Sequence, residues 1–276
     1  MQSMTTFLLP GGLLHENTLS RSAVMSPVTG GLEQSLLENS YSENNLADRV
    51  SKILSQVVNQ IGNHKVDFDL VKNLCVADRQ FLMLQLAQML GNDHVWLHSD
   101  CDNCNEPFDV SVARSQLPVE PAGQSYPFAL AEVQGCKIRL RIPNGADQEK
   151  ITGLDDAHAI RKLLQLCIVT LQPKRDFDEF IASLTNSDLE IIDTALDESS
   201  PAVCASVITQ CPVCEASQNV YLDPYQALFT DANTLYQQVH MLAYYYHWNE
   251  ADILALPKSR RRFYLSMIDQ ARGFSH

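Results

Sequence analysis

Apolar residues recur with helical spacing in the first third of the chain. Gly62-Asn63 ends a helix predicted over residues 43–62, and one face of that helix carries seven apolar side chains: Leu46, Val50, Ile53, Leu54, Val57, Val58 and Ile61. A second helix, at about 78–90, is apolar nearly all round, so we expect it to be buried. The two segments together predict a helical hairpin.

Alternating apolar residues predict strands in the middle of the chain. One alternation follows the turn-like CDNC (Phe108, Val110, Val112), one runs into a Pro-Asn-Gly turn (Ile138, Leu140, Ile142), and one follows a second CxxC (Val220, Leu222). Between them, helices are expected at about 156–171 and 187–198, the second with a capping-box spacing from Ser187 to Glu190.

The C-terminal segment returns to a helical pattern. Asp231 is positioned to cap a helix through Tyr246, Asn249 to cap a short helix stopped by Pro257, and a last helix is expected from about Lys258 to Arg272. At the other end, the first 32 residues are rich in Gly, Ser, Thr and Pro and predict an extended or hairpin-like segment.

These elements predict a fold class and four parts of the chain. We expect an α+β protein, mainly α-helical, with a small split zinc-ribbon β element and a C-terminal helical hairpin. The expected parts are an N-terminal extended arm (1–42), a helical hairpin (43–92), a zinc-ribbon element with an inserted α/β segment (93–230), and a C-terminal helical hairpin (231–276).

Composition and charge narrow the function classes. The chain has 276 residues, 45% of them hydrophobic, and a formal net charge of -13, which argues against binding a polyanion over a broad surface. The dense basic run, KSRRRF at 258–263, is local. The longest apolar stretch, 81–90, is too short to span a membrane, and the start lacks a signal-peptide pattern. A cytoplasmic protein is therefore expected.

Two CxxC pairs are the clearest chemical signal. Cys101 and Cys104 have the same CxxC spacing as Cys211 and Cys214, so the two pairs are expected to act together. Four thiolates suit a closed, structural Zn²⁺ site. The separation of the pairs is long for a zinc ribbon, although loop-closure entropy grows only logarithmically with length. A redox dithiol, unliganded thiols, and replacement of one cysteine by His94 or His98 remain alternatives. The other cysteines lie in apolar patterns and fit the core: Cys75, Cys136, Cys167 and Cys204.

No recognised catalytic motif occurs in the sequence. The patterns G-x-S-x-G, GxxxxGK[ST], H-E-x-x-H and GxGxxG after a strand are all missing. NGADQE, at 144–149, places two carboxylates near a turn, which suits acid/base chemistry, but an acidic first helical turn is the simpler interpretation. The sequence therefore does not predict an enzyme.

The aromatic segment HMLAYYYHWNEADILALPKSRRRFYLSMI, at 240–268, resembles a known family. That family is the baseplate hub assembly and structural proteins of contractile phage tails and related extracellular contractile injection systems, similar to the T-even phage baseplate hub chaperone-type proteins. LPGG with SPVTGGLEQSLL, IPNGADQE and the flanking CxxC pairs carry the resemblance further along the chain.

The resemblance implies a non-enzymatic structural adaptor or assembly chaperone. Its partners would be baseplate hub, spike or tube-initiator proteins, and the protein would be cytoplasmic or incorporated in an assembled tail or injection particle. The expected contact or hairpin-defining residues are Tyr245, Trp248, Arg260, Arg261 and Tyr264. The competing hypotheses are a zinc-ribbon nucleic-acid-binding protein, suggested by the CxxC pairs and KSRRR, and a metallohydrolase or redox enzyme.

Overall fold

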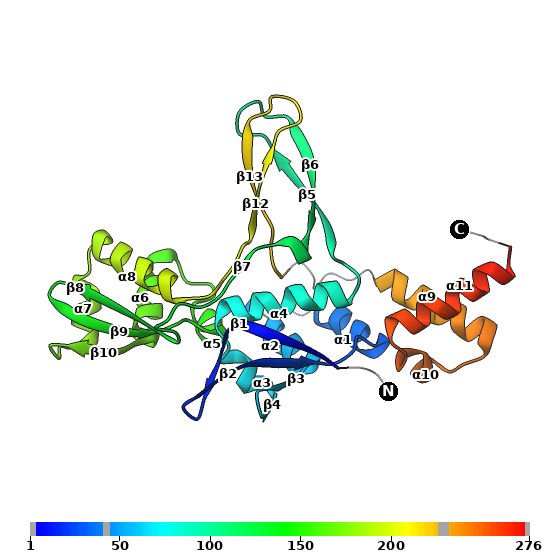
Figure 1. The fold of residues 1–276 in the computed structure, drawn as a ribbon, viewed down its shortest axis with the longest axis horizontal. Coiled ribbons are helices and arrows are strands. Elements are labelled where there is room, and N and C mark those ends of the chain that lie inside the picture. The colour runs from blue at the N-terminus through cyan, green and yellow to red at the C-terminus, as the bar shows by residue number, and fades with distance from the viewer. Residues whose placement is uncertain (1–3, 41–44, 226–231, 274–276) are drawn as a thin grey trace.

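The computed structural model describes residues 4–40, 45–225 and 232–273. A central body carries three projections: a β arm, a lobe of mixed helices and strands, and a helical lobe at the C-terminus (Figure 1). The fold is 45% helical and 29% strand, and its strands form several small antiparallel sheets. The prediction of a mainly α-helical fold is therefore wrong.

The central body joins an antiparallel sheet to four helices. The sheet has the order β1-β2-β3-β4, with β1 (Thr5–His15), β2 (Thr18–Met25), β3 (Val58–Ile61) and β4 (His64–Lys65). Its helices are α1 (Gly30–Ser40), α2 (Leu46–Val57), α3 (Phe68–Lys72) and α4 (Val76–Met89). Their apolar faces share one core, in which Leu9, Met25, Leu54, Ile61 and Leu82 are fully buried or nearly so.

Two expected helices end early and continue as strands. The helix predicted to reach residue 62 ends at Val57, and Val58–Ile61 pairs with β2. The helix predicted to reach 171 ends at Cys167, and β10 (Ile168–Gln172) follows it. Both changes fall at β-branched residues, Val57-Val58 and Ile168-Val169-Thr170, whose stiff side chains favour a pleated backbone once a neighbouring strand is available.

The mixed lobe has its own core. A sheet of order β10-β9-β8, with β8 (Phe128–Val133) and β9 (Cys136–Arg141), packs against α6 (Asp156–Cys167), α7 (Phe177–Ser183) and α8 (Asn186–Ser199). Helix α5 (Gly145–Ile151) connects this lobe to α2 and α3 of the central body. The capping box of α8 is formed by Thr185 and Asp188, not by Ser187 and Glu190, because the helix begins at Asn186.

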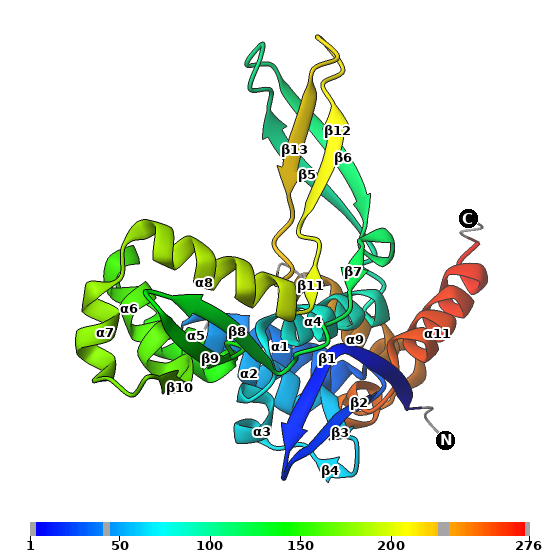
Figure 2. The same ribbon diagram turned by 60° about the vertical axis from the view of Figure 1, so that its left-hand side comes forward.

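The β arm consists of two hairpins that stand away from the central body (Figures 1 and 2). One contains β5 (His94–Asp100) and β6 (Pro107–Ala113), and the other contains β12 (Ser206–Gln210) and β13 (Ser217–Tyr221). The short 3-10 helix Arg114–Gln116 and the pair of β7 (Val119–Glu120) with β11 (Ala202–Val203) lie between the arm and the body. Among the described residues the two hairpins remain separate two-stranded sheets, so the zinc-ribbon fold expected from the sequence is not supported.

The C-terminal lobe contains α9 (Ala232–Tyr246), α10 (Glu250–Leu254) and α11 (Lys258–Ala271). Its core, with Leu235, Leu242, Ile253 and Ile268, also includes Leu37 of α1 and so connects the lobe to the central body. Asn249 caps α10 as predicted, accepting a hydrogen bond from the Asp252 backbone N–H at 2.8 Å. The predicted cap Asp231 lies outside the described residues. No helix in the described ranges combines the length and the hydropathy that a membrane span requires.

Candidate metal centre at the tip of the β arm

The four cysteines of the two CxxC pairs converge at the tip of the arm. Cys101 Sγ lies 3.6 Å from Cys214 Sγ, and Cys104 Sγ lies 3.8 Å from Cys211 Sγ. All four ligand atoms lie within 4.8 Å of one another, and a disulfide bond joins none of them. The first cysteine of each pair is buried, and the second is half-buried. Residues 107 to 113 positions apart in the sequence thus form one cluster of thiols.

Each CxxC forms the same hairpin turn. In the first turn the Asn105 N–H donates to the Cys101 carbonyl, and the Asn103 N–H points at Cys101 Sγ, at 2.9 and 3.4 Å. In the second, Glu215 N–H and Val213 N–H make the equivalent contacts with Cys211, at 2.9 and 3.5 Å. In each hairpin, backbone N–H groups thus lie against the first cysteine of the pair.

The backbone geometry of the turns also agrees. The residue after the second cysteine has a positive φ in both hairpins, 57° at Asn105 and 60° at Glu215. Asn adopts this left-handed conformation readily, whereas Glu does so only when the surrounding structure imposes it. The turn of the second hairpin is therefore held by its setting as well as by its local sequence.

Two side chains connect the turns across the interface between the hairpins. Gln218 of β13 is buried, and its Oε1 accepts a hydrogen bond from the Asp102 N–H at 3.0 Å. Asn103 Nδ2 lies 3.5 Å from Cys214 Sγ. Gln218 was not predicted as part of the site. The sequence feature that could have revealed it is a long polar side chain at an inward-facing position of the strand that follows the second CxxC.

The electrostatics of the cluster favour a bound cation. The hydrogen bond from Asn103 and the backbone N–H of Ala216 lower the pKa of Cys214 to about 6. The Glu106 backbone amide favours ionisation of Cys104 as well, but desolvation and hydrogen bonds with the neighbouring sulfurs outweigh it and raise that pKa to about 12. Cys104 is therefore a neutral thiol at neutral pH when no cation is near, and a cation bound among the sulfurs would favour its thiolate.

The sulfur positions match the requirements of a tetrahedral ion. Four sulfurs at about 2.3 Å from Zn²⁺ lie about 3.8 Å from one another, close to the two contacts between the hairpins. No histidine joins the cluster within the described residues. His98 instead lies on the outer face of the arm, where its Nδ1 is 3.0 Å from Asp109 Oδ1 and the side chain is 70% exposed. The arrangement can bind a metal through four cysteines.

One protein-family model matches most of the chain. The family model described as "T4 bacteriophage base plate protein" matches residues 16–230, which is more than half of the chain. The chain belongs to this base plate protein family. No curated protein and no solved structure matches the chain. The match supports a structural role in a phage base plate and confirms the family suggested by the resemblance.

The base plate family match covers the mixed lobe, the arm with all four clustered cysteines, and the central body apart from β1. It ends before α9, so it does not cover the aromatic segment 240–268 on which the resemblance mainly rested. The family relationship therefore concerns the part of the molecule that holds the candidate metal centre.

Outside the base plate family match, the predicted contact residues fall into two groups. Trp248 and Tyr264 are half-buried and lie edge to face at 4.9 Å between ring centroids, inside the C-terminal lobe. Arg261 is fully buried and forms an ion pair with Glu33 of α1. Tyr245 and Arg260 are exposed. Of the five predicted contact residues, these last two are the exposed ones.

Within the matched region, the carboxylates of NGADQE serve the fold. Asp147 forms the capping box of α5 with Asn144. Its two carboxylate oxygens accept hydrogen bonds from Nη1 and Nη2 of Arg141, at 2.5 and 2.7 Å. Glu149 pairs with Lys72 Nζ at 2.7 Å and accepts a hydrogen bond from Ser51 Oγ at 2.9 Å. Each carboxylate is thus held by a cation or a cap, as the simpler interpretation of the sequence expects.

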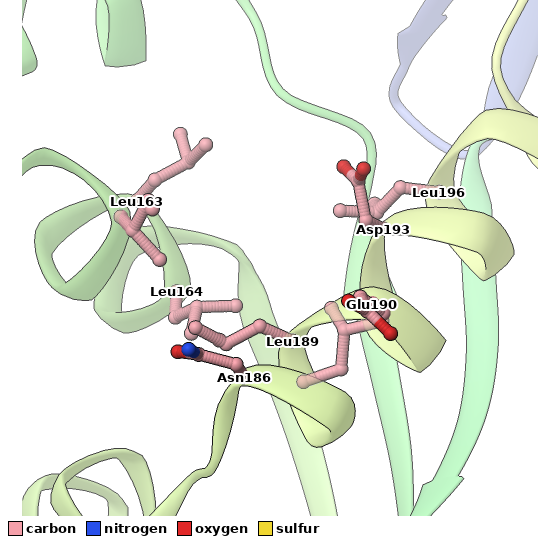
Figure 3. A pocket seen from close by; sticks show the side chains of 9 residues that line it. Leu163, Leu164, Asn186, Leu189, Glu190, Asp193 and Leu196 are labelled. Atoms are coloured by element: carbon pink, nitrogen blue, oxygen red, sulfur yellow. The ribbon is translucent and has the colours of Figure 1, made fainter. Parts of the chain in front are cut away.

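The mixed lobe has an open pocket of about 420 Å³ between α6 and α8. Figure 3 shows Leu163 and Leu164 facing Leu189 across the pocket, with the carboxylates of Glu190 and Asp193 nearby. The lining contains no His, Cys, Ser or Lys, so no nucleophile stands beside a base among these residues. The pocket is an apolar depression with an acidic edge formed by Glu190 and Asp193.

Proposed function

We propose that this chain acts without catalysis, as a structural adaptor or assembly chaperone of a base plate, and that a structural zinc ion holds its β arm together. The expected partners are base plate hub, spike or tube-initiator proteins. Membership of the base plate family supports the structural role. The convergence of Cys101, Cys104, Cys211 and Cys214 is the single observation that carries the metal assignment.

Zinc is the ion that best fits the donor set. Four thiolates are soft ligands that favour Zn²⁺ or iron over Mg²⁺ or Ca²⁺, and Zn²⁺ has no redox chemistry that would disturb a structural site. Four protein ligands would complete its coordination shell and leave no position for an activated water. When bound, the ion would supply cohesion to the arm, and Gln218 and the turn amides would orient the ligands.

The nucleic-acid alternative loses support because the basic run is divided by the fold. Arg261 points into the molecule, and Lys258 is half-buried with its Nζ bonded to the Leu90 carbonyl. Arg260 and Arg262 remain exposed. Two exposed arginines on a chain of net charge -13 make a poor site for a phosphate backbone. Salt-sensitive DNA binding in a gel-shift assay would support this alternative.

Metal analysis with matched cysteine variants tests the zinc site. We expect one zinc per purified chain, retained by Cys204→Ser and lost by Cys211→Ser. Cys204 is a suitable control because it is a half-buried cysteine outside the cluster, with its Sγ 3.0 Å from the Ser206 carbonyl oxygen. A wild-type chain that contains no zinc, and whose CxxC thiols are alkylated readily in the native state, would refute the assignment.

Co-purification tests the base plate role. The chain should be recovered in assembled particles if it is an adaptor, or only with assembly intermediates if it is a chaperone. Normal particle assembly in cells that lack the gene would contradict both roles.

A further inference from the structure

The β arm carries large apolar side chains on surfaces that no part of the described chain covers. Three stand out on the strands of the arm: Trp96 is 70% exposed, Ile208 is 79% exposed, and Tyr221 is 74% exposed. Val213, at the tip, is 64% exposed. Leu97, Phe108 and Val220 of the same strands are buried between the hairpins, so the arm has an apolar interior of its own. The outer apolar residues are therefore additional to those the fold requires.

Strand register places these side chains on the two opposite outer faces of the arm. On the first hairpin Trp96 is opposite Ser111, on the same face as the pair His98 and Asp109. On the second hairpin Ile208 is opposite Asn219, and Tyr221 is the diagonal neighbour of Ile208 on that face. Because both outer faces expose aromatic or aliphatic anchors, a partner that covers them must contact the arm from both sides.

The charge of the arm is one-sided. Residues 94–113 and 205–222 contain no Lys or Arg, whereas they contain five carboxylates: Asp100, Asp102, Glu106, Asp109 and Glu215. The arm therefore carries negative charge without any Lys or Arg, whereas the rest of the chain contains all 20 Lys and Arg side chains together with its other acidic residues. A complementary surface must supply positive charge around pockets for Trp96, Ile208 and Tyr221.

We propose that the β arm is a docking element that inserts into a cleft of a partner protein, and that this cleft is apolar inside and lined at its edge by Arg and Lys. Trp96 anchors one face and the Ile208–Tyr221 pair anchors the other. The exposed aromatic rings supply the contact area that dominates binding energy at interfaces. The inference extends the proposed function, because it identifies which surface of the adaptor binds and what the surface of its partner must contain.

The shape of the arm supports insertion over contact with a flat surface. Figures 1 and 2 show it projecting from the central body, so a cleft can surround it without touching the other lobes. At its tip the Asp102 N–H donates a hydrogen bond to Gln218 Oε1 of the other hairpin, and the ion proposed for the four converging cysteines would join the hairpins further. A rigid element loses little conformational entropy on docking, and more of its contact energy therefore appears as affinity.

Site-specific photocrosslinking in cells that make the whole particle tests this proposal. Benzoylphenylalanine is placed at position 96, 208 or 221 of the full chain, and at position 130 as a matched control. Leu130 lies on β8 of the mixed lobe and is 67% exposed, which is close to the exposure of the arm residues. We expect crosslinks from positions 96 and 221 to one partner protein, in peptides next to Arg or Lys, and only background from position 130.

Substitution gives an independent readout. Trp96→Ser or Tyr221→Ser should weaken association with that partner about tenfold or more, as loss of an aromatic anchor does, and Leu130→Ser should leave it unchanged. Raising the salt concentration should weaken it too, since exposed charges are screened. Unchanged zinc content and circular dichroism show that the variants fold.

Three results would overturn the proposal: crosslinking from the arm no stronger than from position 130, crosslinks to lipid or to a second copy of this chain, or full association of the Trp96→Ser and Tyr221→Ser variants. These results are separate from failure of the proposed function. A chain that is present in particles but shows no arm-specific crosslinks refutes the docking element alone. A chain that is absent from both particles and assembly intermediates, but whose arm crosslinks to a basic partner, refutes the base plate role alone.

Discussion

Replacing Arg261 tests whether this residue holds the C-terminal lobe or is free for a partner. Its side chain is 0% exposed, and that of its ion-pair partner Glu33 is 4% exposed. Arg261 also donates to the Leu256 carbonyl at 2.9 Å and to Gln238 Oε1 at 3.3 Å. Arg261→Met would leave the Glu33 carboxylate buried without its guanidinium, which costs about 3–5 kcal/mol for a buried pair.

Because both side chains are shielded from water, no reduction for solvent screening applies to this figure. The free energy of unfolding of the C-terminal lobe should fall by that amount. At a typical slope of about 2 kcal/mol per molar urea, the midpoint of the transition should fall by about 1.5–2.5 M. Replacing both partners, in Glu33→Met with Arg261→Met, should restore most of the loss, since no unpaired charge remains.

Tryptophan fluorescence can follow this lobe separately. The chain has two tryptophans, and a Trp96→Phe background leaves only Trp248, which stacks on Tyr246 at 5.0 Å between ring centroids. Arg260→Met, at the exposed neighbouring position, is the matched control and should change the free energy of unfolding by less than about 0.5 kcal/mol. An Arg261→Met transition that coincides with that of Arg260→Met would refute the reasoning and return Arg261 to the candidate partner contacts.

Three further predictions address the body, a cap and the metal. Gly145→Ala should destabilise the chain by about 1–3 kcal/mol in urea denaturation, because the added Cβ would collide with the buried Arg79 guanidinium, whereas Gly31→Ala meets only ordinary contacts and should not. Asn249→Ala should lower the stability of the C-terminal lobe by about 1 kcal/mol, and Asn249→Asp should retain it; equal losses would contradict a capping role. Chelation of the metal should open the arm to chymotrypsin at the buried Phe108, and a cleavage rate unchanged by the chelator would argue against metal-dependent stability.

Local sequence patterns predicted the elements that depend on local physics. The apolar stripe of α2, the all-round apolar α4, the Asn249 cap and the strands after both CxxC pairs follow from side-chain periodicity and capping chemistry. The two helices that were predicted too long show the limit of this approach. Periodicity alone does not show that the chain changes from helix to strand at Val58 and Ile168. The hydrogen-bonding partner that stabilises each strand comes from a distant segment.

The sequence by itself determined the residue types of the candidate metal centre and the approximate bounds of several helices, among them α4, α8 and α11. Tertiary structure decided that Cys101 meets Cys214 across 113 residues, that Gln218 connects the two turns, and that Arg261 points inward while Arg260 points outward. Spacing within a CxxC is set by a few backbone torsions and can be read from the sequence. Contact between distant hairpins, and the direction of neighbouring side chains, depend on which surfaces pack together, and only the folded chain fixes these.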